Sequence, residues 1–390
     1  MLTIDLNQRL VPNNGQIFCV YSGRHRRFFQ EFSERSIVFL ETPDMHVSPT
    51  ILNNDNELRR HIRRSVAMSD MINELGSARP RDFPIENYDG LPHKDDRTVN
   101  SLIGSFKLLF KNAKVGDLII SPESGTYREI LFGEIVTDPD PKDRISLSKF
   151  SGLSTPFRRV KWIKRRDAST ALPENLSRLL SRRPAVSKII PDDETDEFYD
   201  IAYGDYVNNR SSRMNIFSPD YAPKNFYAVN SINHALSVIL ATHNAVSAQI
   251  PAEQLLAMTE TEIVHTFLRD VDVLYIKQLF ASPGNTSIKS RVRELAPLIG
   301  TLMTIFLAGS AAQLFNKQHQ AVQIQIENSS HPAGSSRRQS ELNDEFCDSL
   351  SESVRLTAEA LGLKRCLALQ KVTQSANEEL GTEVTPKVVP

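Results

Sequence analysis

Residues 115–136, VGDLIISPESGTYREILFGEIV, decide the fold of the N-terminal half of the chain. Two largely apolar runs, DLII at residues 117–120 and ILFGEIV at residues 130–136, lie on either side of a short segment that contains Ser-Gly-Thr. Apolar runs joined by small, turn-forming residues are typical of a β-hairpin. We therefore predict two paired strands here, and we expect Asp117, directly after Gly116, to close the turn that precedes the first strand.

The segments around this hairpin carry further strand and helix patterns. Residues 17–21 and 36–40 are short apolar runs, and residues 157–163 alternate basic and apolar side chains, as a half-exposed strand does. Residues 56–75 and 101–110 space their apolar side chains as helices do. The N-terminal half therefore predicts a small mixed barrel or sheet with inserted helices.

The pattern changes after Pro191. Apolar residues now recur with a period near 3.6 residues, which is typical of helices. The predicted helices cover residues 230–248, 251–279, 288–326 and 343–377. We expect an all-α C-terminal domain. The whole chain is thus predicted to be an α+β protein, in which a small β-barrel with inserted helices precedes that domain.

Charge also divides the 390 residues. Residues 1–190 hold 30 Lys and Arg against 23 Asp and Glu, a net charge of +7, whereas residues 191–390 hold 16 against 24, a net charge of −8. An anionic partner therefore fits the first half and not the second. The predicted organisation is a ligand- or nucleic-acid-sensing domain over residues 1–190, an acidic linker over 191–200, a helical domain over 201–328, a flexible loop over 329–340, a C-terminal helix over 341–380 and a tail over 381–390.

One segment of the second half is unusually apolar. Leu295–Phe315, LAPLIGTLMTIFLAGSAAQLF, contains no charged side chain over 21 residues, about the length of a membrane span. Thr301, Ser310 and Gln313 dilute its apolar character, and it contains no Trp or Tyr to mark a membrane interface. Two interpretations stay open: a helix buried at the centre of the C-terminal domain, and a segment that contacts the inner membrane.

The cysteines and the N-terminus favour the cytoplasm. Cys19, Cys347 and Cys366 are odd in number and lack the spacing of a metal site, which fits a reducing compartment. The sequence MLTIDLNQRL lacks the apolar core of a signal peptide. The inner membrane is the alternative location, through the apolar segment.

Five short motifs of the N-terminal half occur in a characteristic order along the chain. In chain order they are FCVYSGR (18–24), FSERSIV (32–38), VGDLIISP (115–122), ILFGEIV (130–136) and RRVKWI (158–163). Together they resemble the PUA/EVE-like N-terminal module of Mrr-type restriction proteins and related prokaryotic defence proteins. The resemblance covers about residues 15–190. It departs from the family at Phe39-Leu40, where a Gly-Trp pair usually follows the second strand.

The resemblance implies a small β-barrel that holds a nucleotide, or a flipped and often modified base, in an aromatic-lined pocket. Such a pocket needs a flat aromatic face, which contributes about 1–3 kcal/mol of stacking free energy per base, and polar groups for the base edge. The ligand-binding residues that we predict are Tyr21, Ser22, Gly23, Arg24 and Trp162. We expect the rings of Tyr21 and Trp162 to wall one slot that opens to solvent. Backbone amides near Gly23 and the planar guanidinium of Arg24 would contact a phosphate.

A basic cluster surrounds the single tryptophan. The predicted nucleic-acid-binding residues are Arg26, Arg27, Arg158, Lys161, Lys164, Arg165 and Arg166. Cations interleaved with an aromatic ring are typical of a nucleic-acid surface. The alternation also fits a plainer arrangement, with Trp162 in the barrel core and the cations on a solvated face. The sequence leaves both open.

The sequence shows no catalytic or cofactor pattern. No Asp and Glu/Gln-x-Lys pair stands on adjacent predicted strands, and no zinc spacing, phosphate loop or Gly-x-Ser-x-Gly occurs. We therefore predict a non-enzymatic sensor in prokaryotic antiviral defence, without cofactor or metal. It would bind a nucleotide, modified nucleobase or nucleic acid through its N-terminal module, and oligomerise or signal through its helical half. A membrane-acting effector and a structural subunit that docks a partner protein in a defence complex are the alternatives.

Overall fold

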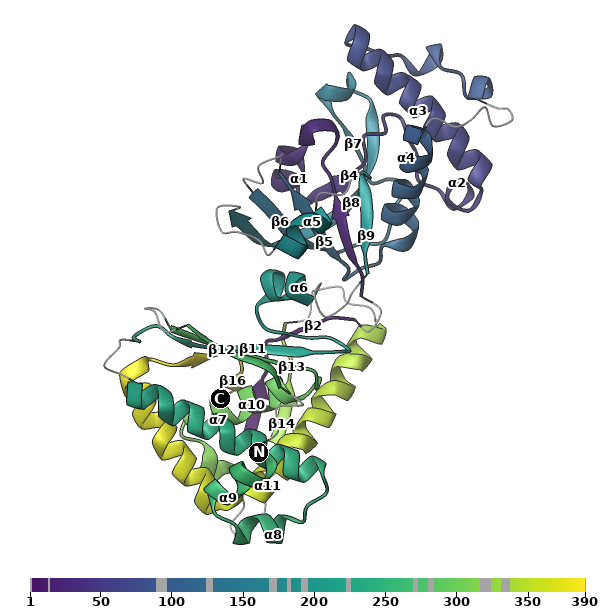
Figure 1. Cartoon of the computed structure of the whole chain (residues 1–390). Coiled ribbons are helices and arrows are strands. Elements are labelled where there is room, and N and C mark those ends of the chain that lie inside the picture. Colours follow the sequence, from purple (N-terminus) through teal and green to yellow (C-terminus); the bar gives the residue numbers. More distant parts are fainter. Residues whose placement is uncertain are drawn as a thin grey trace. The chain divides into compact units, whose positions relative to one another are not determined.

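The computed structural model shows two compact units (Figure 1). The N-terminal unit comprises residues 14–202, and the C-terminal unit comprises residues 1–13 and 203–390. The structure describes residues 2–12, 15–88, 97–123, 129–167, 174–180, 184–190, 196–221, 226–268, 273–279, 284–315, 324–330 and 337–389.

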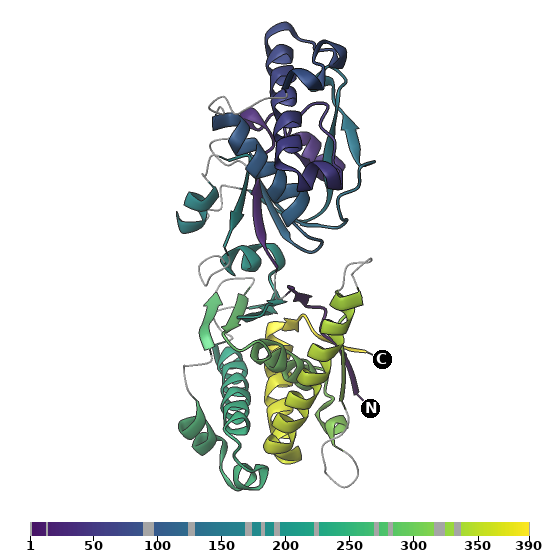
Figure 2. The same cartoon turned by 90° about the vertical axis from the view of Figure 1, so that its right-hand side faces the viewer.

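The first 13 residues belong with the C-terminal half, although the sequence predicted one domain over residues 1–190. The reason is β1 (Leu2–Asp5), which lies between two strands from the other end of the chain. It pairs in parallel with β14 (Ile324–Glu327) and antiparallel with β16 (Lys387–Val389). Both chain ends therefore lie in the C-terminal unit (Figure 2). The residues that were predicted as a tail after 380 form β15 and β16 instead.

Within the described residues, the N-terminal unit contains seven strands and six α-helices together with short helical turns. Its elements are β3 (Ile17–Val20), η1 (Arg24–Arg26), α1 (Phe29–Arg35), β4 (Ile37–Phe39), α2 (Pro49–Asn53), α3 (Asp55–Leu75), η2 (Pro80–Asp82), η3 (Ile85–Tyr88), α4 (Arg97–Lys107), the π-helical turn η4 (Leu108–Asn112), β5 (Leu118–Pro122), β6 (Glu129–Ile135), β7 (Arg144–Ser146), η5 (Ser148–Phe150), β8 (Ser154–Asp167), α5 (Glu174–Leu180), β9 (Val186–Ile189) and α6 (Asp196–Tyr203). Part of the predicted linker, residues 191–195, lies outside the described residues, and the rest belongs to α6.

A seven-stranded sheet forms the centre of the N-terminal unit. Its strands follow the order β4-β8-β6-β5-β3-β9, and β7 pairs with β8. β3 and β5 are parallel, and the other neighbours are antiparallel. The predicted hairpin is confirmed, because Ile120 of β5 lies opposite Phe132 of β6. Asp117 closes the turn before β5 as expected: its carboxylate accepts hydrogen bonds from the backbone amides of Lys114 and Gln16.

The sheet curls where β6 meets the long strand β8 (Figure 1). The pairing of the two strands shifts register between Phe132 and Gly133, and such a bulge bends a strand. Gly133 permits the close approach that results. A Cβ atom at this position would lie 2.6 Å from side-chain atoms of Trp162 and Val160, and 2.8 Å from the carbonyl oxygen of Lys161.

Helices α3 and α4 pack together beside the sheet (Figure 1). Leu58 and Ile62, one turn apart on α3, share an apolar core with Phe106 of α4 and Ile119 of β5. This spacing is why residues 56–75 form an amphipathic helix. The helix begins at Asn54, whose side chain accepts hydrogen bonds from two backbone amides of the first turn.

The C-terminal unit contains strands as well as helices, so the prediction of an all-α domain is wrong. Its elements are β1, β2 (Arg9–Leu10), β10 (Tyr206–Val207), β11 (Ser212–Ser218), α7 (Phe226–Ser247), α8 (Ala252–Ala257), α9 (Glu260–Phe267), β12 (Val273–Leu279), β13 (Gly284–Ser290), α10 (Leu295–Leu307), η7 (Ala311–Leu314), β14, α11 (Arg337–Leu380), β15 (Glu383–Val384) and β16. One sheet has the order β12-β13-β11-β10-β2, with β15 beside β11, and the other has the order β14-β1-β16.

The region is nevertheless largely helical. α7 and α11 confirm the helices predicted over residues 230–248 and 343–377, and they run side by side (Figure 2). The helices predicted over 251–279 and 288–326 are wrong at their ends, because β12, β13 and β14 occupy those residues. Of the predicted loop over 329–340, residues 331–336 lie outside the described residues.

The apolar segment Leu295–Phe315 is a core element of the C-terminal unit. α10 spans only 13 residues, and all of its residues from Leu295 to Phe306 are buried. Leu302 shares an apolar core with Ile239 of α7 and Leu350 of α11. The structure therefore favours the buried helix over a membrane segment. Within the described parts of the chain, no helix combines the length and hydropathy that crossing a bilayer requires.

Candidate ligand pocket of the N-terminal unit

A cavity of about 760 Å³ brings together four of the residues predicted from the sequence: Tyr21, Gly23, Arg24 and Arg26. We call it the Tyr21 pocket. The residues that also line it are His25, Glu41, Val66, Ser69, Arg97, Thr98, Ser101, Leu102, Pro184 and Ala185. Its volume lies within the range of about 300–1,000 Å³ that small-molecule pockets occupy. The lining combines apolar walls with arginines and hydroxyls.

Tyr21 and Arg26 form one wall of the Tyr21 pocket. Tyr21 follows the end of β3 and is 8% exposed, and its hydroxyl donates a hydrogen bond to the carbonyl oxygen of Leu180. The guanidinium of Arg26 lies over the ring, with Cζ 4.7 Å from the ring centroid. A planar cation on an aromatic face is a cation–π arrangement. The exposed surface of this wall is therefore the flat guanidinium as much as the ring.

The loop that carries these residues has an unusual backbone. Gly23, His25 and Arg26 have φ angles of +79°, +52° and +58°. Residues other than glycine adopt this left-handed region at a cost of about 1–2 kcal/mol each. Two such residues in succession are typical of functional loops. The sequence anticipated the glycine, and not the conformation of the two residues after it.

Glu41 is the acidic residue of the Tyr21 pocket. Its Oε2 accepts a hydrogen bond from the backbone amide of Arg24 at 2.8 Å, and its Oε1 pairs with Nη2 of Arg27. The amide that was predicted to contact a phosphate is therefore already bonded to a carboxylate. The cationic side chains of this loop that line the pocket are Arg26 and Arg24, and Nη2 of Arg24 lies 3.8 Å from Oδ1 of Asp70.

The opposite wall comes from α3 and α4. Arg97, at the start of α4, is exposed and lines the pocket with Thr98 and Ser101 from the same helix. Ser69 of α3 adds a buried hydroxyl. Arginines from two separate elements thus face one cavity, which suits an anionic group between them.

Ser22 and Arg27 support the pocket from outside its lining. The Ser22 side chain is buried, and its Oγ donates a hydrogen bond to the carbonyl oxygen of Arg26 at 3.4 Å. Arg27 is 30% exposed, pairs with Glu41 and lies over the Phe28 ring. Both residues therefore hold the loop and Glu41 in place.

Trp162 does not line the Tyr21 pocket, so the expectation of one slot walled by both rings is wrong. Its ring is half-buried against the apolar core, and its Nε1 donates a hydrogen bond to the carbonyl oxygen of Phe32 at 2.8 Å. The strand order explains the separation, because β6 and β5 lie between β8, which carries Trp162, and β3, which leads to Tyr21. Of the two interpretations, the core position of Trp162 is the one observed.

Arg158 is not available to nucleic acid, contrary to the prediction. It is 1% exposed, and its guanidinium donates hydrogen bonds to the carbonyl oxygens of Leu109, Ala113 and Thr137 at 2.8, 3.1 and 2.8 Å. Burial lowers the pKa of Arg158 to about 10. The residue therefore ties the end of the α4 region to β8.

The other basic residues of β8 form a more exposed set. Lys161, Lys164 and Arg165 are exposed, and Arg166 is half-buried. Nε of Arg165 lies 2.9 Å from Oε1 of Glu129, which offsets part of its charge. None of these residues lines the Tyr21 pocket. They are basic residues of β8 that lie outside the pocket.

The sequence missed Glu41 and the residues from α3 and α4. Glu41 lies two residues after the end of β4, and Tyr21 lies directly after the end of β3. Polar side chains at strand ends often form binding sites. Arg97 precedes a helix that was predicted to begin at Ser101. A search for charged residues at strand and helix ends would have found both.

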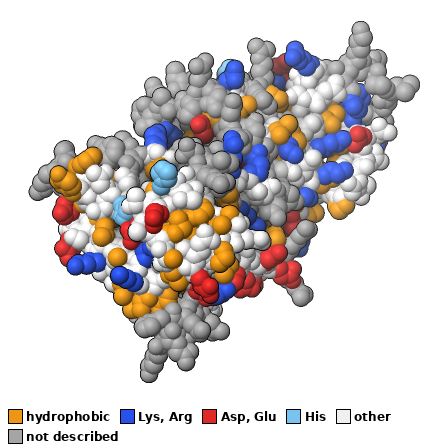
Figure 3. All heavy atoms as spheres, turned by 60° about the horizontal axis from the view of Figure 1, so that its bottom comes forward, with side chains coloured by type: hydrophobic (Ala, Val, Ile, Leu, Met, Phe, Trp, Pro, Cys, Tyr) orange, Lys and Arg blue, Asp and Glu red, His pale blue; other side chains and the backbone are white. Residues whose placement is uncertain are grey.

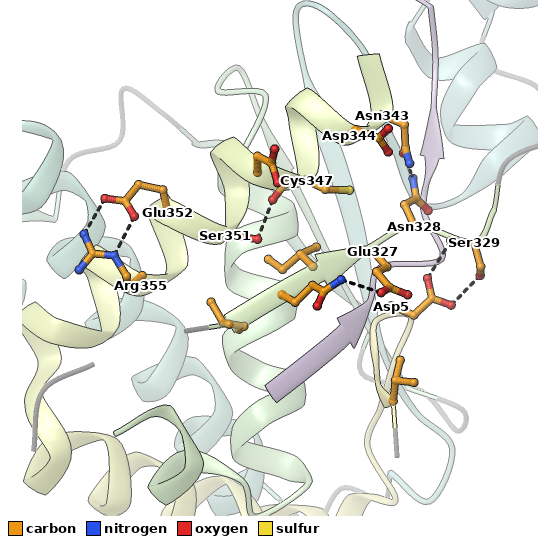
Figure 4. A pocket seen from close by; sticks show the side chains of 15 residues that line it. Asp5, Glu327, Asn328, Ser329, Asn343, Asp344, Cys347, Ser351, Glu352 and Arg355 are labelled. Atoms are coloured by element: carbon orange, nitrogen blue, oxygen red, sulfur yellow. Dashed lines mark hydrogen bonds and ion pairs between the residues drawn. The ribbon is translucent and has the colours of Figure 1, made fainter. Parts of the chain in front are cut away.

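A second cavity, of about 1030 Å³, lies in the C-terminal unit between β14 and α11 (Figure 4). Carboxylates dominate its lining: Asp5, Glu327, Asp344, Asp348 and Glu352. Burial, and then the charges of Asp344, Asp348, Asp5 and Glu327, raise the pKa of Cys347 to about 12. Figure 3 shows acidic side chains next to hydrophobic ones on the forward-facing surface of this unit. The acidic cavity disfavours an anionic ligand, and the i, i+4, i+8 spacing of Asp344, Asp348 and Glu352 marks it in the sequence.

Among the described residues, neither a metal cluster nor a similar protein indicates a function. Across the described residues, no group of three or more His, Cys, Asp or Glu side chains is arranged to hold a metal ion. Comparison with models of known protein families, with curated proteins and with solved structures finds no match.

Proposed function

We propose that the N-terminal unit binds a nucleotide, or a nucleobase within nucleic acid, in the Tyr21 pocket. The protein would act as a non-enzymatic sensor of such a ligand, in keeping with the resemblance of residues 15–190 to PUA/EVE-like modules of prokaryotic defence proteins. The C-terminal unit would pass the signal on, by oligomerisation or by contact with a partner protein.

The single observation that carries the proposal is the gathering of Arg24, Arg26 and Arg97 around a cavity with a flat aromatic wall. Arginine forks bind phosphate oxygens bidentately, and a guanidinium plane also stacks on a base. The lining holds three arginines and His25 against one carboxylate, Glu41, and a second carboxylate, Asp70, lies 3.8 Å from Arg24 outside the lining. The pocket therefore favours an anion that also carries a flat, apolar ring.

The charge of the two halves supports the same direction. Residues 1–190 carry a net charge of +7, and residues 191–390 carry −8. The exposed cations of β8, Lys161, Lys164 and Arg165, add a basic face within the same unit as the pocket. A nucleic acid strand with one base in the pocket would meet cations beyond it, and its binding would weaken as salt rises.

Equilibrium binding of the full chain tests the proposal. Labelled single-stranded DNA, RNA, modified-base DNA and cyclic nucleotides would be titrated with the protein at about 50 and 200 mM salt, a range over which phosphate contacts weaken measurably. The variant R26E/R97E should weaken binding by more than about tenfold, because it replaces two attractive contacts with repulsive ones. The control is Lys142→Glu, which reverses one exposed charge of the same unit at a residue that does not line the pocket.

The outcomes separate cleanly. Salt-sensitive binding that R26E/R97E abolishes and Lys142→Glu retains supports the proposal. If Lys142→Glu lowers the binding free energy by about half as much as R26E/R97E, which reverses twice as many charges, the contact is a diffuse electrostatic one and not a pocket. The absence of binding to every ligand in the series overturns the function.

A further inference from the structure

Glu41 is a nearly buried carboxylate in an otherwise cationic pocket. Its side chain is only 10% exposed. Its described donors are the backbone amide of Arg24, at 2.8 Å from Oε2, and the guanidinium of Arg27 at Oε1. The guanidinium balances the negative charge of Glu41, and each of the two donors contacts one of its oxygens.

A carboxylate has room for more hydrogen bonds than these. When ionised it only accepts, and its two oxygens offer about four lone-pair sites. Two of those sites are used by Arg24 and Arg27, and Glu41 lines the Tyr21 pocket. A ligand that reaches Glu41 must therefore present N–H or O–H donors, because a ligand acceptor placed there would be repelled and left unpaired.

Guanine is the common base whose edge matches this demand. Its Watson–Crick edge carries two adjacent donors, N1–H and the N2 amino group, which can meet both oxygens of a carboxylate in parallel, as a guanidinium does. Adenine and cytosine place one amino donor beside a ring acceptor, and uracil and thymine place one donor between two carbonyls. We infer that the Tyr21 pocket selects a guanine nucleotide and that Glu41 is its specificity-determining residue. The inference rests on the proposed function of the pocket as a nucleotide site.

The remaining lining residues fit such a ligand. The guanidinium of Arg26, supported 4.7 Å above the Tyr21 ring, offers a plane for the base. Arg24 and Arg97 are exposed and stand on different elements, where they can hold the phosphate. Leu102, Val66 and Pro184 supply apolar surface around the ring.

A purely structural role for Glu41 makes a different prediction. If Glu41 only holds the backbone of Arg24 and the side chain of Arg27, its replacement weakens all nucleotides alike. If Glu41 reads the base, its replacement changes the ratio between bases. The ratio of affinities is therefore the quantity to measure.

The experiment measures the affinity of the full chain for GMP, IMP, AMP and CMP. GMP should bind at least about tenfold more tightly than AMP and CMP, because a matched bidentate contact discriminates bases by that much. IMP retains N1–H and lacks the 2-amino group, so its affinity should fall between those of GMP and AMP. In Glu41→Gln, whose amide offers one acceptor and one donor, the GMP-to-AMP ratio should fall to about threefold or less.

The control is Glu34→Gln, an exposed carboxylate of α1 that does not line the pocket. It should retain the wild-type ratios. Thermal unfolding of both variants checks that they fold, and if Glu41→Gln does not fold, the wild-type series of GMP, IMP and AMP carries the test alone.

Each result decides something. A preference for GMP that weakens in IMP and disappears in Glu41→Gln supports the inference. Equal affinities of the wild-type protein for all four nucleotides, or a GMP preference that Glu41→Gln retains, overturn it and leave the proposed function standing. The absence of nucleotide binding, together with no binding to the nucleic acids tested above, overturns both.

Discussion

Arg26 lies over Tyr21, with its guanidinium carbon 4.7 Å from the centroid of the ring. The pair joins the end of β3 to the strained turn that follows it, and both residues line the same cavity. A ligand that enters the cavity therefore meets a surface that is planar and positively charged. The planarity and the charge of the Arg26 guanidinium can be tested separately by substitution.

Arg26→Lys keeps the charge and removes the plane. An ammonium group is a compact, strongly hydrated charge that does not stack as a guanidinium does. We expect nucleotide affinity to fall by about tenfold in Arg26→Lys, the loss of a stacking contact of about 1–3 kcal/mol. Titration of the full chain measures it. If Arg26→Lys binds as tightly as the wild type, charge alone explains the contribution of Arg26.

Arg158 should be essential for stability and not for binding. Its removal in Arg158→Ala leaves the carbonyl oxygens of Leu109, Ala113 and Thr137 without their donor. Each buried, unsatisfied acceptor costs about 1–3 kcal/mol. We therefore expect the free energy of unfolding to fall by about 3 kcal/mol or more. Chemical denaturation measures this loss.

The control for this variant is its neighbour. Arg159 is 53% exposed, and its Nη2 lies 2.8 Å from Oδ1 of Asp143. Surface ion pairs contribute about 0–1 kcal/mol, so Arg159→Ala should change stability by less than that. Equal effects of the two substitutions would contradict the structural role of Arg158.

Gly133→Ala tests the curl of the sheet. The added methyl group would lie 2.6 Å from atoms of Trp162 and Val160 and 2.8 Å from a backbone oxygen. The backbone oxygen cannot rotate away, so overpacking should destabilise the unit by about 1–3 kcal/mol. Gly104→Ala is the control, since a Cβ atom there meets nothing within 4 Å. If Gly133→Ala unfolds at the wild-type denaturant concentration, β6 and β8 are not packed this closely.

The raised pKa of Asp117 predicts how the stability of the protein depends on pH. Burial raises the pKa of its carboxyl from 3.8 to about 6, although the amides of Lys114 and Gln16 oppose the shift. Between pH 4 and pH 6 the folded state therefore holds a proton that the unfolded state has lost. The contribution of Asp117 to stability is thus most favourable below pH 4, falls as the pH rises, and is constant above about pH 6.

Asp117→Asn removes this titration. The difference in unfolding free energy between wild type and Asp117→Asn should decrease by up to about 3 kcal/mol from pH 4 to pH 7. Denaturation of both proteins across this range measures it. A difference that stays constant with pH would mean that the carboxyl of Asp117 titrates at its ordinary pKa.

Local patterns predicted the N-terminal sheet well. The apolar runs within residues 117–120 and 130–136, which are close in the sequence, pair as β5 and β6 as predicted. Residues 56–75 form α3 because Leu58, Ile62 and their neighbours share one face. Such signals lie within about 20 residues, where periodicity is informative.

Local sequence patterns did not predict the strands of the C-terminal unit. β12, VLYIKQL, mixes apolar and polar residues without strict alternation, and β13, GNTSIKS, has a single large apolar residue, Ile288, so neither carries the period-2 pattern of a half-exposed strand. β1 pairs with β14 and β16 across more than 300 residues, and no local pattern encodes that contact. The membrane interpretation of residues 295–315 failed for the related reason that a fully buried helix is as apolar as a spanning one.

The sequence predicted only those residues of the candidate site that are close together in the chain. Tyr21, Gly23, Arg24 and Arg26 are close in sequence and were predicted together. Glu41 and Arg97 reach the pocket from other elements, and Trp162 is kept from it by two intervening strands. Spatial neighbours that come from separate elements depend on tertiary structure, which composition and spacing do not contain.

The most direct measurement of the central claim is photo-crosslinking of an azido-nucleotide to the full chain, followed by mass spectrometry of the labelled peptides. A nucleotide in the Tyr21 pocket should label residues 21–26 or 97–102, and unlabelled nucleotide should compete. Labelling confined to residues 161–166 of β8, or to the C-terminal unit, would contradict a ligand site in this pocket.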